Sequence, residues 1–301
     1  MISIIVITYN RSGLLAKTVR SILAQTYRKF ELIVVNDGST DDTVEILESI
    51  GDVRINHVNE GKIGNLSKLR NIGIKKASFE YIAFCDDDDL WVENKLEVQL
   101  KYTKDHKFIC SNAAVIDEND KVIKENYFDL IKENFIIDKK YLLQDGNSIL
   151  TSSLLVEKKI LTENNILFDE IFITNYCEDY ELFLRLSEHS GFLFINENLV
   201  LKRLHSSVSG GYENNLIMLN SSVSILKSYV GKESKQTDKY AIEGILGFKQ
   251  LMVTVSFKLS RSRGFRELKN YLIYLSDPSV LNVFLKRKLI RKIAKTIGLR
   301  N

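Results

Sequence analysis

Apolar runs alternate with amphipathic segments along roughly the first ninety residues, and this alternation restricts the chain to a small set of folds. The run at residues 2–7 is almost wholly apolar, as in a strand buried on both faces. Leu15, Val19 and Ile22 then recur at the spacing of an amphipathic helix. The expected strands are residues 2–7, 32–35, 53–58 and 79–85. Strands that alternate with helices predict an α/β fold with a parallel sheet covered by helices on both faces.

The pattern beyond residue 89 is mixed and then becomes helical. Helices are expected at residues 91–102 and 178–188, and strands at 108–115, 149–156, 192–195 and 199–204. From about Asn214 only helices are expected, at residues 217–229, 240–260, 265–275 and 281–297. A boundary is therefore predicted near Gly210 and Gly211, between an α/β domain and a helical C-terminal region.

The composition excludes several classes of protein. The 301 residues carry a net charge of +3, which is too slight to indicate nucleic acid as a partner. The three cysteines lack metal-ligand spacing and indicate reduced thiols in a cytosolic protein. The apolar run at residues 2–7 is too short for a signal peptide, and no stretch reaches the ~20 apolar residues of a membrane-spanning helix. We therefore expect a cytoplasmic location.

Four consecutive carboxylates, Asp86, Asp87, Asp88 and Asp89, follow the expected strand at residues 79–85. Adjacent carboxylates repel one another and stay ionised only where a cation or hydrogen-bond donors compensate them. Because ligand sites in open α/β sheets lie at the carboxyl ends of strands, we expect a divalent metal with a phosphorylated ligand here. The alternative is a solvated acidic turn, whereas the spacing excludes an EF-hand.

Five segments resemble a known family, and they occur in the order in which that family carries them. They are SIIVITYNR, SILAQTYRKFELIVVNDGSTDDT, SKLRNIGIKKASFEYIAFCDDDDLW, CEDYELFLRL and RLHSSVSG. The chain resembles the family 2 glycosyltransferases with the GT-A fold over roughly residues 1–210. The resemblance implies a nucleotide-binding half at about residues 1–105 and an acceptor half at about 106–210. The helical region at residues 211–301 is not covered.

The resemblance implies a role for each carboxylate of the D-x-D motif at residues 86–88. Asp88 is expected to bind the metal directly, and Asp86 to lie nearer the ribose or the metal's waters. Asp87 is expected to contact the donor substrate. His205 would complete the metal site, although a lone histidine is commonly structural. The cofactor implied is Mn²⁺ or Mg²⁺, which would stabilise the charge of a leaving nucleoside diphosphate.

The end of the first strand and the turn after the second are expected to bind the nucleotide. By resemblance, Thr8, Tyr9 and Asn10 belong to the donor site, although Thr8 stands where many relatives carry proline. Tyr9 offers an aromatic face for a nucleobase, or else packs half-buried. Asp37 can accept from a base N–H or a ribose hydroxyl, or else caps its own turn.

Arg70 is also expected in the donor site by resemblance. Leu69 and Ile72 are expected to face the core, which leaves Arg70 on another side of its helix. An arginine in that place is otherwise a solvated surface group. Its planar fork suits a base, a carboxylate or a phosphate.

Asp179 is the expected catalytic base of an inverting transfer, again by resemblance. It would accept the proton of the acceptor hydroxyl as that oxygen attacks the anomeric carbon. Glu178 is expected to orient the acceptor or the donor. The alternative is that both carboxylates only complement the positive N-terminus of a helix.

The tail at residues 280–301 is basic and amphipathic, with seven Lys and Arg and no acidic residue. Such a helix suits an anionic membrane surface and lipid-linked acceptors. It could equally pack its apolar stripe on its own domain or serve an oligomer.

These features together predict a metal-dependent, inverting glycosyltransferase that adds one sugar to a carbohydrate or lipid-linked acceptor in surface polysaccharide assembly. UDP is the nucleotide expected from the family. No Q-x-x-R-W segment of a processive synthase and no glycine-rich signature of a nucleotidyltransferase or dinucleotide oxidoreductase is present. The remaining alternative is a non-catalytic module that binds sugar nucleotides or serves as a scaffold.

Overall fold

The computed structural model describes residues 1–171, 177–204, 212–275 and 280. The chain divides into two compact units. The first comprises Met1–Asp138 and Ser148–Leu204, and the second comprises Lys139–Asn147 and His205–Asn301. The boundary predicted near Gly210 lies outside the described residues. The structure groups residues 139–147, which the sequence leaves in the first domain, with the C-terminal helices.

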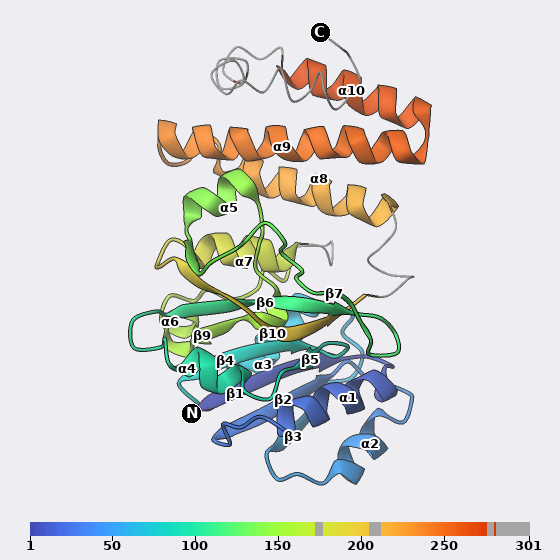
Figure 1. Cartoon of the computed structure of the whole chain (residues 1–301), viewed down its shortest axis with the longest axis vertical. Helices are drawn as coiled ribbons and strands as arrows, with labels where there is room; N and C mark the ends of the chain where they lie inside the picture. Colours follow the sequence, from blue (N-terminus) through green and yellow to red (C-terminus); the bar gives the residue numbers. More distant parts are fainter. Residues whose placement is uncertain (172–176, 205–211, 276–279, 281–301) are drawn as a thin grey trace. The chain divides into compact units, whose positions relative to one another are not determined.

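Four parallel strands form the first part of the sheet in the first unit (Figure 1). They run in the order β3 (Ile55–Asn59), β2 (Phe30–Asn36), β1 (Ile2–Thr8) and β4 (Tyr81–Asp86). The helices that connect them are α1 (Ser12–Leu23), α2 (Thr43–Ile50) and α3 (Leu66–Lys76). The predicted parallel sheet is therefore confirmed.

The third strand begins two residues later than the sequence predicts. Val53, its expected first residue, is 99% exposed. Asp52 instead closes a turn, because its backbone carbonyl accepts from the Ile55 N–H at 3.0 Å and its carboxylate accepts from the Arg54 N–H at 2.9 Å. The apolar run thus starts with a turn and pairs with β2 only from Ile55.

The sheet continues beyond β4 with mixed directions. The order is β4, β9 (Leu155–Glu157), β6 (Phe108–Ile116), β10 (Phe192–Arg203) and β5 (Leu90–Trp91), and β7 (Val122–Lys124) and β8 (Phe135–Ile137) pair beside this path. β6 and β10 form a long parallel ladder, whereas β9 runs antiparallel to both β4 and β6. The sheet is mixed with its long ladders parallel, as the fold class predicted.

Two expected strands at residues 192–195 and 199–204 form one strand, β10. Asn196 and Asn198, which lie between the two expected strands, bond to neighbouring segments. Asn196 accepts from the Asn112 side chain at 3.1 Å, and Asn198 donates to the Glu125 carbonyl at 2.7 Å. The ladder with β6 absorbs them as register shifts around Asn198.

The expected helix at residues 91–102 is shorter, and so is the expected strand at 149–156. Trp91 lies in β5, where its indole N–H donates to the Ser152 carbonyl at 2.9 Å, and α4 spans only Lys95–Leu100. A single 3-10 turn, Thr151–Ser153, precedes β9. The remaining helices of the unit are α6 (Lys158–Glu163) and α7 (Glu178–Leu186).

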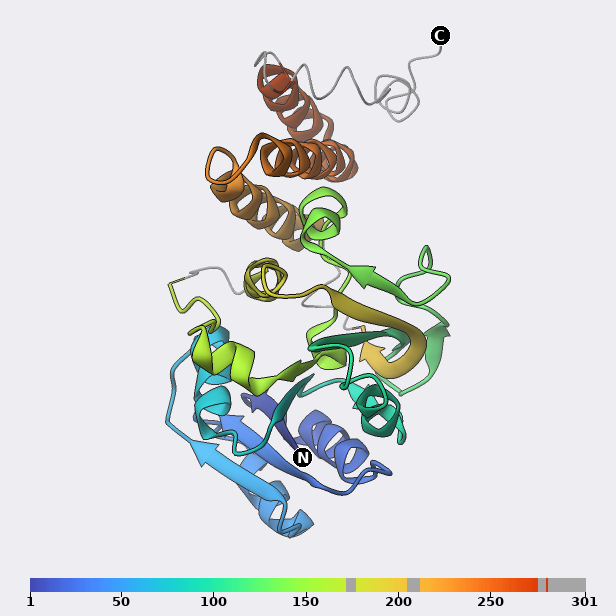
Figure 2. The ribbon, with the colours of Figure 1, turned by 90° about the vertical axis from the view of Figure 1, so that its left-hand side faces the viewer.

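The core of the first unit lies on both faces of the sheet, with α1 and α3 on opposite sides (Figures 1 and 2). Val6 and Leu32 on one face and Ile33 on the other are completely buried, and apolar burial of this kind is the main stabilising contribution. α3 lies so close to β1 that a Cβ on Gly73 would stand 2.5 Å from the Ile5 side chain. This close packing fixes the position of the polar side chains of α3 relative to β1.

The second unit is helical within its described residues. It contains α5 (Lys139–Asp145), α8 (Tyr212–Tyr229), α9 (Lys235–Leu259) and α10 (Arg261–Leu275). The helix predicted from residue 240 begins earlier because Ser234 caps it, accepting from the Thr237 N–H at 3.1 Å. None of the described helices combines the length and apolarity of a membrane span. The expected helix at 281–297 lies outside the described residues.

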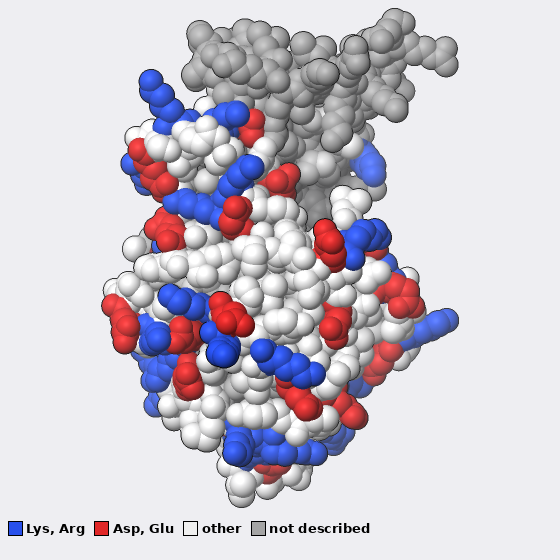
Figure 3. Space-filling model, turned by 60° about the vertical axis from the view of Figure 1, so that its left-hand side comes forward, with Lys and Arg blue, Asp and Glu red and all other residues white. Residues whose placement is uncertain are grey.

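Charges of both signs are interspersed over the face of the first unit that Figure 3 shows. Lysine and arginine do not gather in one part of the face that this view shows.

Candidate active site

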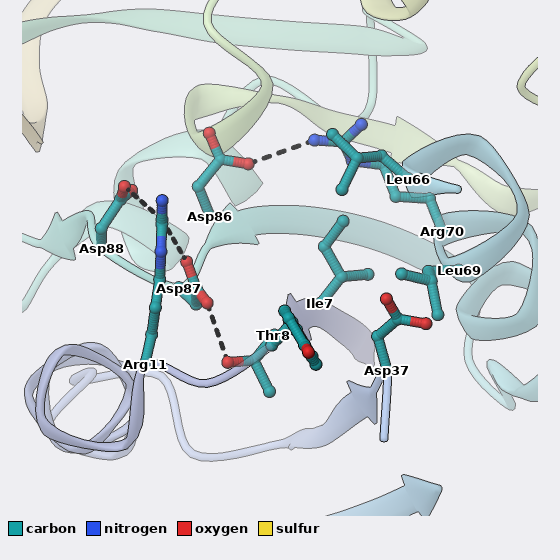
Figure 4. A pocket seen from close by; sticks show the side chains of 11 residues that line it. Ile7, Thr8, Arg11, Asp37, Leu66, Leu69, Arg70, Asp86, Asp87 and Asp88 are labelled. Atoms are coloured by element: carbon teal, nitrogen blue, oxygen red, sulfur yellow. Dashed lines mark hydrogen bonds and ion pairs between the residues drawn. The ribbon is translucent and has the colours of Figure 1, made fainter. Parts of the chain in front are cut away.

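A pocket of about 340 Å³ opens at the carboxyl edge of β1, β2 and β4, entirely within the first unit. Ligand sites of open α/β sheets lie at this edge. Seven predicted site residues line the pocket: Thr8, Tyr9, Asp37, Arg70, Asp86, Asp87 and Asp88 (Figure 4). They are joined by Arg11 and by apolar side chains of Ile7, Leu66 and Leu69. Residues far apart in sequence thus form one site.

Three of the four aspartates bring carboxylate oxygens together. Asp86, Asp88 and Asp89 each offer an oxygen within 4.8 Å of the others. Asp89 was not predicted as a ligand, yet it is completely buried. Its carboxylate accepts from the Ser152 hydroxyl at 2.5 Å and from the backbone N–H of Arg203 at 3.0 Å. A cluster of hard oxygen donors of this kind suits Mg²⁺ or Mn²⁺.

Two cations from distant elements compensate the aspartates. Arg11 donates to Asp87 at 3.1 Å and to Asp88 at 2.9 Å (Figure 4). Lys202, on β10, lies 3.1 Å from an Asp89 oxygen and 3.4 Å from an Asp86 oxygen. The turn is therefore not a solvated acidic turn, which was the alternative to a binding site.

The protonation of the aspartates differs along the turn. Burial opposes ionisation of Asp86, but Lys202 and Arg70 outweigh it and lower its pKa. Burial raises the pKa of Asp87 to about 6 and that of Asp89 to about 6, against the attraction of Arg11 and Lys202 respectively. A cation added to this cluster would favour the ionised forms.

Thr8, which stands where many relatives carry proline, bonds to one of the aspartates. Its hydroxyl donates to Asp87 at 2.8 Å in a buried hydrogen bond. Thr8 and Arg11 thus use oxygens on both sides of the Asp87 carboxyl, which leaves the metal-binding group to Asp86, Asp88 and Asp89. The side chain of Thr8, the last residue of β1, thus holds Asp87 in position.

Asn10 lies between Tyr9 and Arg11, which line the pocket, but is not itself a lining residue. Its φ is +50°, in the left-handed region that non-glycine residues seldom adopt. Its side-chain oxygen accepts from the Thr40 N–H at 2.7 Å, and its own N–H donates to the Ser39 hydroxyl at 3.0 Å. Asn10 therefore ties the end of β1 to the loop after β2.

Asp37 and Tyr9 stand at the other end of the pocket. Asp37 is buried and accepts from the Lys62 ammonium at 2.8 Å and from the backbone N–H groups of Ile63 and Gly64. Burial raises its pKa, but these donors outweigh that effect and the pKa is lowered. Tyr9 is 42% exposed and is not a packed core residue. Asp37 caps a neighbouring loop and not its own turn.

Arg70 is buried, so the surface alternative for this residue is wrong. Its side chain is 8% exposed and donates to Glu178 at 2.6 Å and to Asp86 at 3.3 Å. Ile72, expected to face the core, is only half-buried, whereas Ile74 is 1% exposed. Arg70 is buried because a segment around Phe168, distant in sequence, covers a second side of α3.

Asp179 opens α7 next to the same ion pair. It accepts from the Thr151 hydroxyl at 3.3 Å and from the Tyr180 N–H at 2.7 Å. Burial and the neighbouring Glu178 raise the pKa of Asp179 to about 6, although Arg70 opposes them. Cys177, just before α7, has a φ of +74°, and strain of this kind is common at functional sites. A carboxylate with this pKa can act as a general base near neutral pH.

Several charged residues of the site were given no individual role from the sequence. They are Arg11, Lys62, Asp89, Lys202 and Arg203. Asp89 alone carried a local signal, as the fourth member of the aspartate run. The completely buried Arg203 donates to the Asp88 carbonyl at 2.9 Å and so holds the turn in place. His205 lies outside the described residues, and its metal role stays a prediction.

The chain is similar to known proteins in sequence and in structure. The family model for glycosyl transferase family 2 matches residues 3–159. An uncharacterized glycosyltransferase of Rickettsia bellii is 43% identical over 126 residues, which cover 41% of this chain. The chain spans about a fifth of the length of the first curated relatives it matches, 18% for this one.

A relative of similar length is the Escherichia coli UDP-Glc:alpha-D-GlcNAc-diphosphoundecaprenol beta-1,3-glucosyltransferase WfaP. It is 32% identical over 200 residues, 66% of this chain and 75% of the relative. The crystal structure of S. aureus TarS in complex with UDP-GlcNAc superposes with a TM-score of 0.68. It covers 90% of this chain and 80% of that chain at 18% identity, and this likeness concerns the fold alone.

These similarities confirm the family that the sequence motifs indicated. The mixed sheet and the structural likeness to TarS establish the predicted GT-A fold with its helical C-terminal region. The family model matches more than half of the chain, and a relative that is 32% identical is aligned over three quarters of its own length. The chain belongs to the family 2 glycosyltransferases.

Proposed function

We propose that this glycosyltransferase is metal-dependent and inverting, and that it moves one sugar from a UDP-sugar to a carbohydrate or lipid-linked acceptor in surface polysaccharide assembly. One observation carries the proposal. Arg70 joins Asp86 of the aspartate cluster to Glu178, the neighbour of the half-buried Asp179. A phosphate-binding edge and a candidate base thus belong to one electrostatic network.

The donor side of the site divides into two groups of residues. Tyr9 and Asp37 lie at the end of the pocket where a nucleobase could stack and donate an N–H group. Asp86 and Asp88, with Asp89 beside them, would hold Mn²⁺ or Mg²⁺. When bound, this ion supplies positive charge that stabilises the leaving diphosphate.

The chemistry of transfer falls to Asp179. Its carboxylate accepts the proton of the acceptor hydroxyl as that oxygen attacks the anomeric carbon from the side opposite the leaving group. The new C–O bond forms as the bond to the diphosphate oxygen breaks, and the anomeric configuration inverts. Glu178 and Arg70 hold the start of α7 in position, because their ion pair is buried at 2.6 Å.

The acceptor class is proposed from the relatives. WfaP and WfgD of E. coli, 32% and 28% identical, are glucosyltransferases that act on GlcNAc linked to diphosphoundecaprenol. A lipid-linked acceptor would place the enzyme at the cytoplasmic face of the membrane as a peripheral protein. The tail expected to provide that contact, or to serve an oligomer, lies largely outside the described residues.

The non-catalytic alternative predicts a site in which a functional carboxylate has been lost. Asp88 lines the pocket, and Asp179 follows Glu178, the partner of Arg70 in the pocket wall. The pKa of Asp179 is raised to about 6. This supports an active enzyme over a module that only binds sugar nucleotides. No observation on the described residues favours the scaffold.

A calorimetric titration tests the proposal. UDP, ADP and GDP are titrated with and without Mn²⁺ into the wild type, Asp88→Ala and the control Asp42→Ala, an exposed aspartate. We expect Mn²⁺-dependent binding of UDP by the wild type and the control, and its loss in Asp88→Ala. Binding of UDP that is equally tight without metal and in Asp88→Ala would contradict the metal dependence. No binding of any nucleotide would overturn the donor assignment.

A further inference from the structure

The loop between β3 and α3 reaches the two groups that would receive the nucleobase. The ammonium of Lys62 lies 2.8 Å from a carboxylate oxygen of Asp37. The same ammonium lies 3.0 Å from the centroid of the Tyr9 ring. An ammonium over an aromatic face and beside a carboxylate is stabilised by both contacts. A base stacked on Tyr9 and bonded to Asp37 would need the space that Lys62 takes.

Three donors engage both oxygens of the Asp37 carboxylate while Lys62 is bound. One oxygen accepts from the N–H groups of Ile63 at 2.5 Å and Gly64 at 3.0 Å. The other accepts from Lys62 at 2.8 Å and from Gly64 at 3.1 Å. A carboxylate offers about four lone-pair positions. The Gly64 N–H is shared between both oxygens, and an incoming N–H group therefore competes with these donors for the carboxylate.

Lys62 is the donor that can leave without moving the backbone. Its side chain is 51% exposed, whereas the other donors are main-chain groups of the loop. The loop itself rests against Gly38, where an added Cβ would stand 2.7 Å from the backbone nitrogen of Lys62. Gly38 has a φ of +71°, a conformation that suits glycine. Loss of the Lys62 side chain thus leaves the loop anchored.

We propose that Lys62 is a specificity residue that competes with the nucleobase for Tyr9 and Asp37. This inference rests on the proposed function, because it concerns the base subsite of the same donor site. A base that offers a ring N–H to Asp37 and a flat face to Tyr9 replaces both contacts of the ammonium. A base without such an N–H leaves the Asp37 carboxylate short of a donor, which disfavours its binding.

The test compares Lys62→Ala with the wild type by titration of uridine, which carries no phosphate, and of UDP with Mn²⁺. Lys68→Ala is the matched control, because Lys68 is exposed on the neighbouring helix α3. Removal of a competing ion pair and cation–π contact is expected to tighten uridine binding roughly three- to tenfold. Added salt screens the Lys62–Asp37 pair of the wild type, so it should narrow the difference in uridine affinity between Lys62→Ala and the wild type. Lys68→Ala should bind as the wild type does.

The outcomes separate this inference from the proposed function. If UDP binds to the wild type and uridine binds to Lys62→Ala no more tightly than to the wild type, the competition is refuted and the donor site stands. Weaker uridine binding by Lys62→Ala would show that Lys62 assists the base, and would also refute it. If neither protein binds any nucleotide with Mn²⁺, the donor site itself is refuted together with the inference. Circular dichroism confirms that each variant is folded.

Discussion

Replacing Arg70 by methionine tests the network that joins the aspartate cluster to α7. Methionine keeps much of the length of the side chain but removes its charge and donors. Arg70 and Glu178 are 8% and 9% exposed, and they are 2.6 Å apart. Asp86, the other partner of Arg70, is 31% exposed and keeps Lys202 as a second cation. The main consequence of Arg70→Met is therefore an unpaired carboxylate at Glu178.

The magnitude follows from that burial. Breaking a buried ion pair by removing one partner costs about 3–5 kcal/mol, because the remaining charge is left without compensation. Adding Glu178→Gln removes the stranded charge, so the double variant is expected to lose only about 1–2 kcal/mol relative to the wild type. The two substitutions should therefore be strongly non-additive. Arg20→Met, at an exposed position on α1, should change stability by less than about 0.5 kcal/mol.

Urea unfolding followed by tryptophan fluorescence is the assay. Trp91 is the only tryptophan of the chain, is 3% exposed and belongs to the same unit as Arg70, so its signal reports the relevant transition. A loss below about 1 kcal/mol in Arg70→Met, or additivity of the two single substitutions, would refute the reasoning. Either result would mean that the ion pair is not a buried, compensated pair in solution.

Two further predictions concern the chemistry of the site and the support of the aspartate turn. Because Asp179 has a pKa of about 6 and must be ionised to accept a proton, kcat/KM should fall about tenfold per pH unit below pH 6 and level off above it. Asp179→Asn should lower kcat by about 10²- to 10⁴-fold and lack this acid limb; an unchanged pH–rate profile would contradict its role as the base. Thr8→Val keeps the shape but removes the 2.8 Å donor to the buried Asp87, so it should destabilise the protein by about 1–2 kcal/mol in the urea assay. A variant as stable as the wild type would show that this hydrogen bond contributes nothing.

Local sequence patterns determined the elements that lie close together along the chain. The four apolar runs became β1 to β4 within a few residues, because strand and helix periodicity is a property of neighbouring residues. The position of the aspartate run behind the fourth apolar run predicted that it lies at the carboxyl edge of the sheet. The family's motifs pointed to Tyr9, Asp37 and Arg70, all of which line the pocket. These inferences needed no knowledge of distant contacts.

The tertiary structure alone decided which charges meet. The buried Arg70 pairs with Glu178, 108 positions along the chain, and Lys202 reaches Asp89 across 113 positions. Asn198 lies in a continuous strand, where its side-chain N–H group donates to a distant segment. Periodicity cannot reveal such pairings, since electrostatic compensation depends on distance in space and on burial. The sequence by itself determined the sheet and the chemical character of its edge, whereas the fold decided how each charge of the site is compensated.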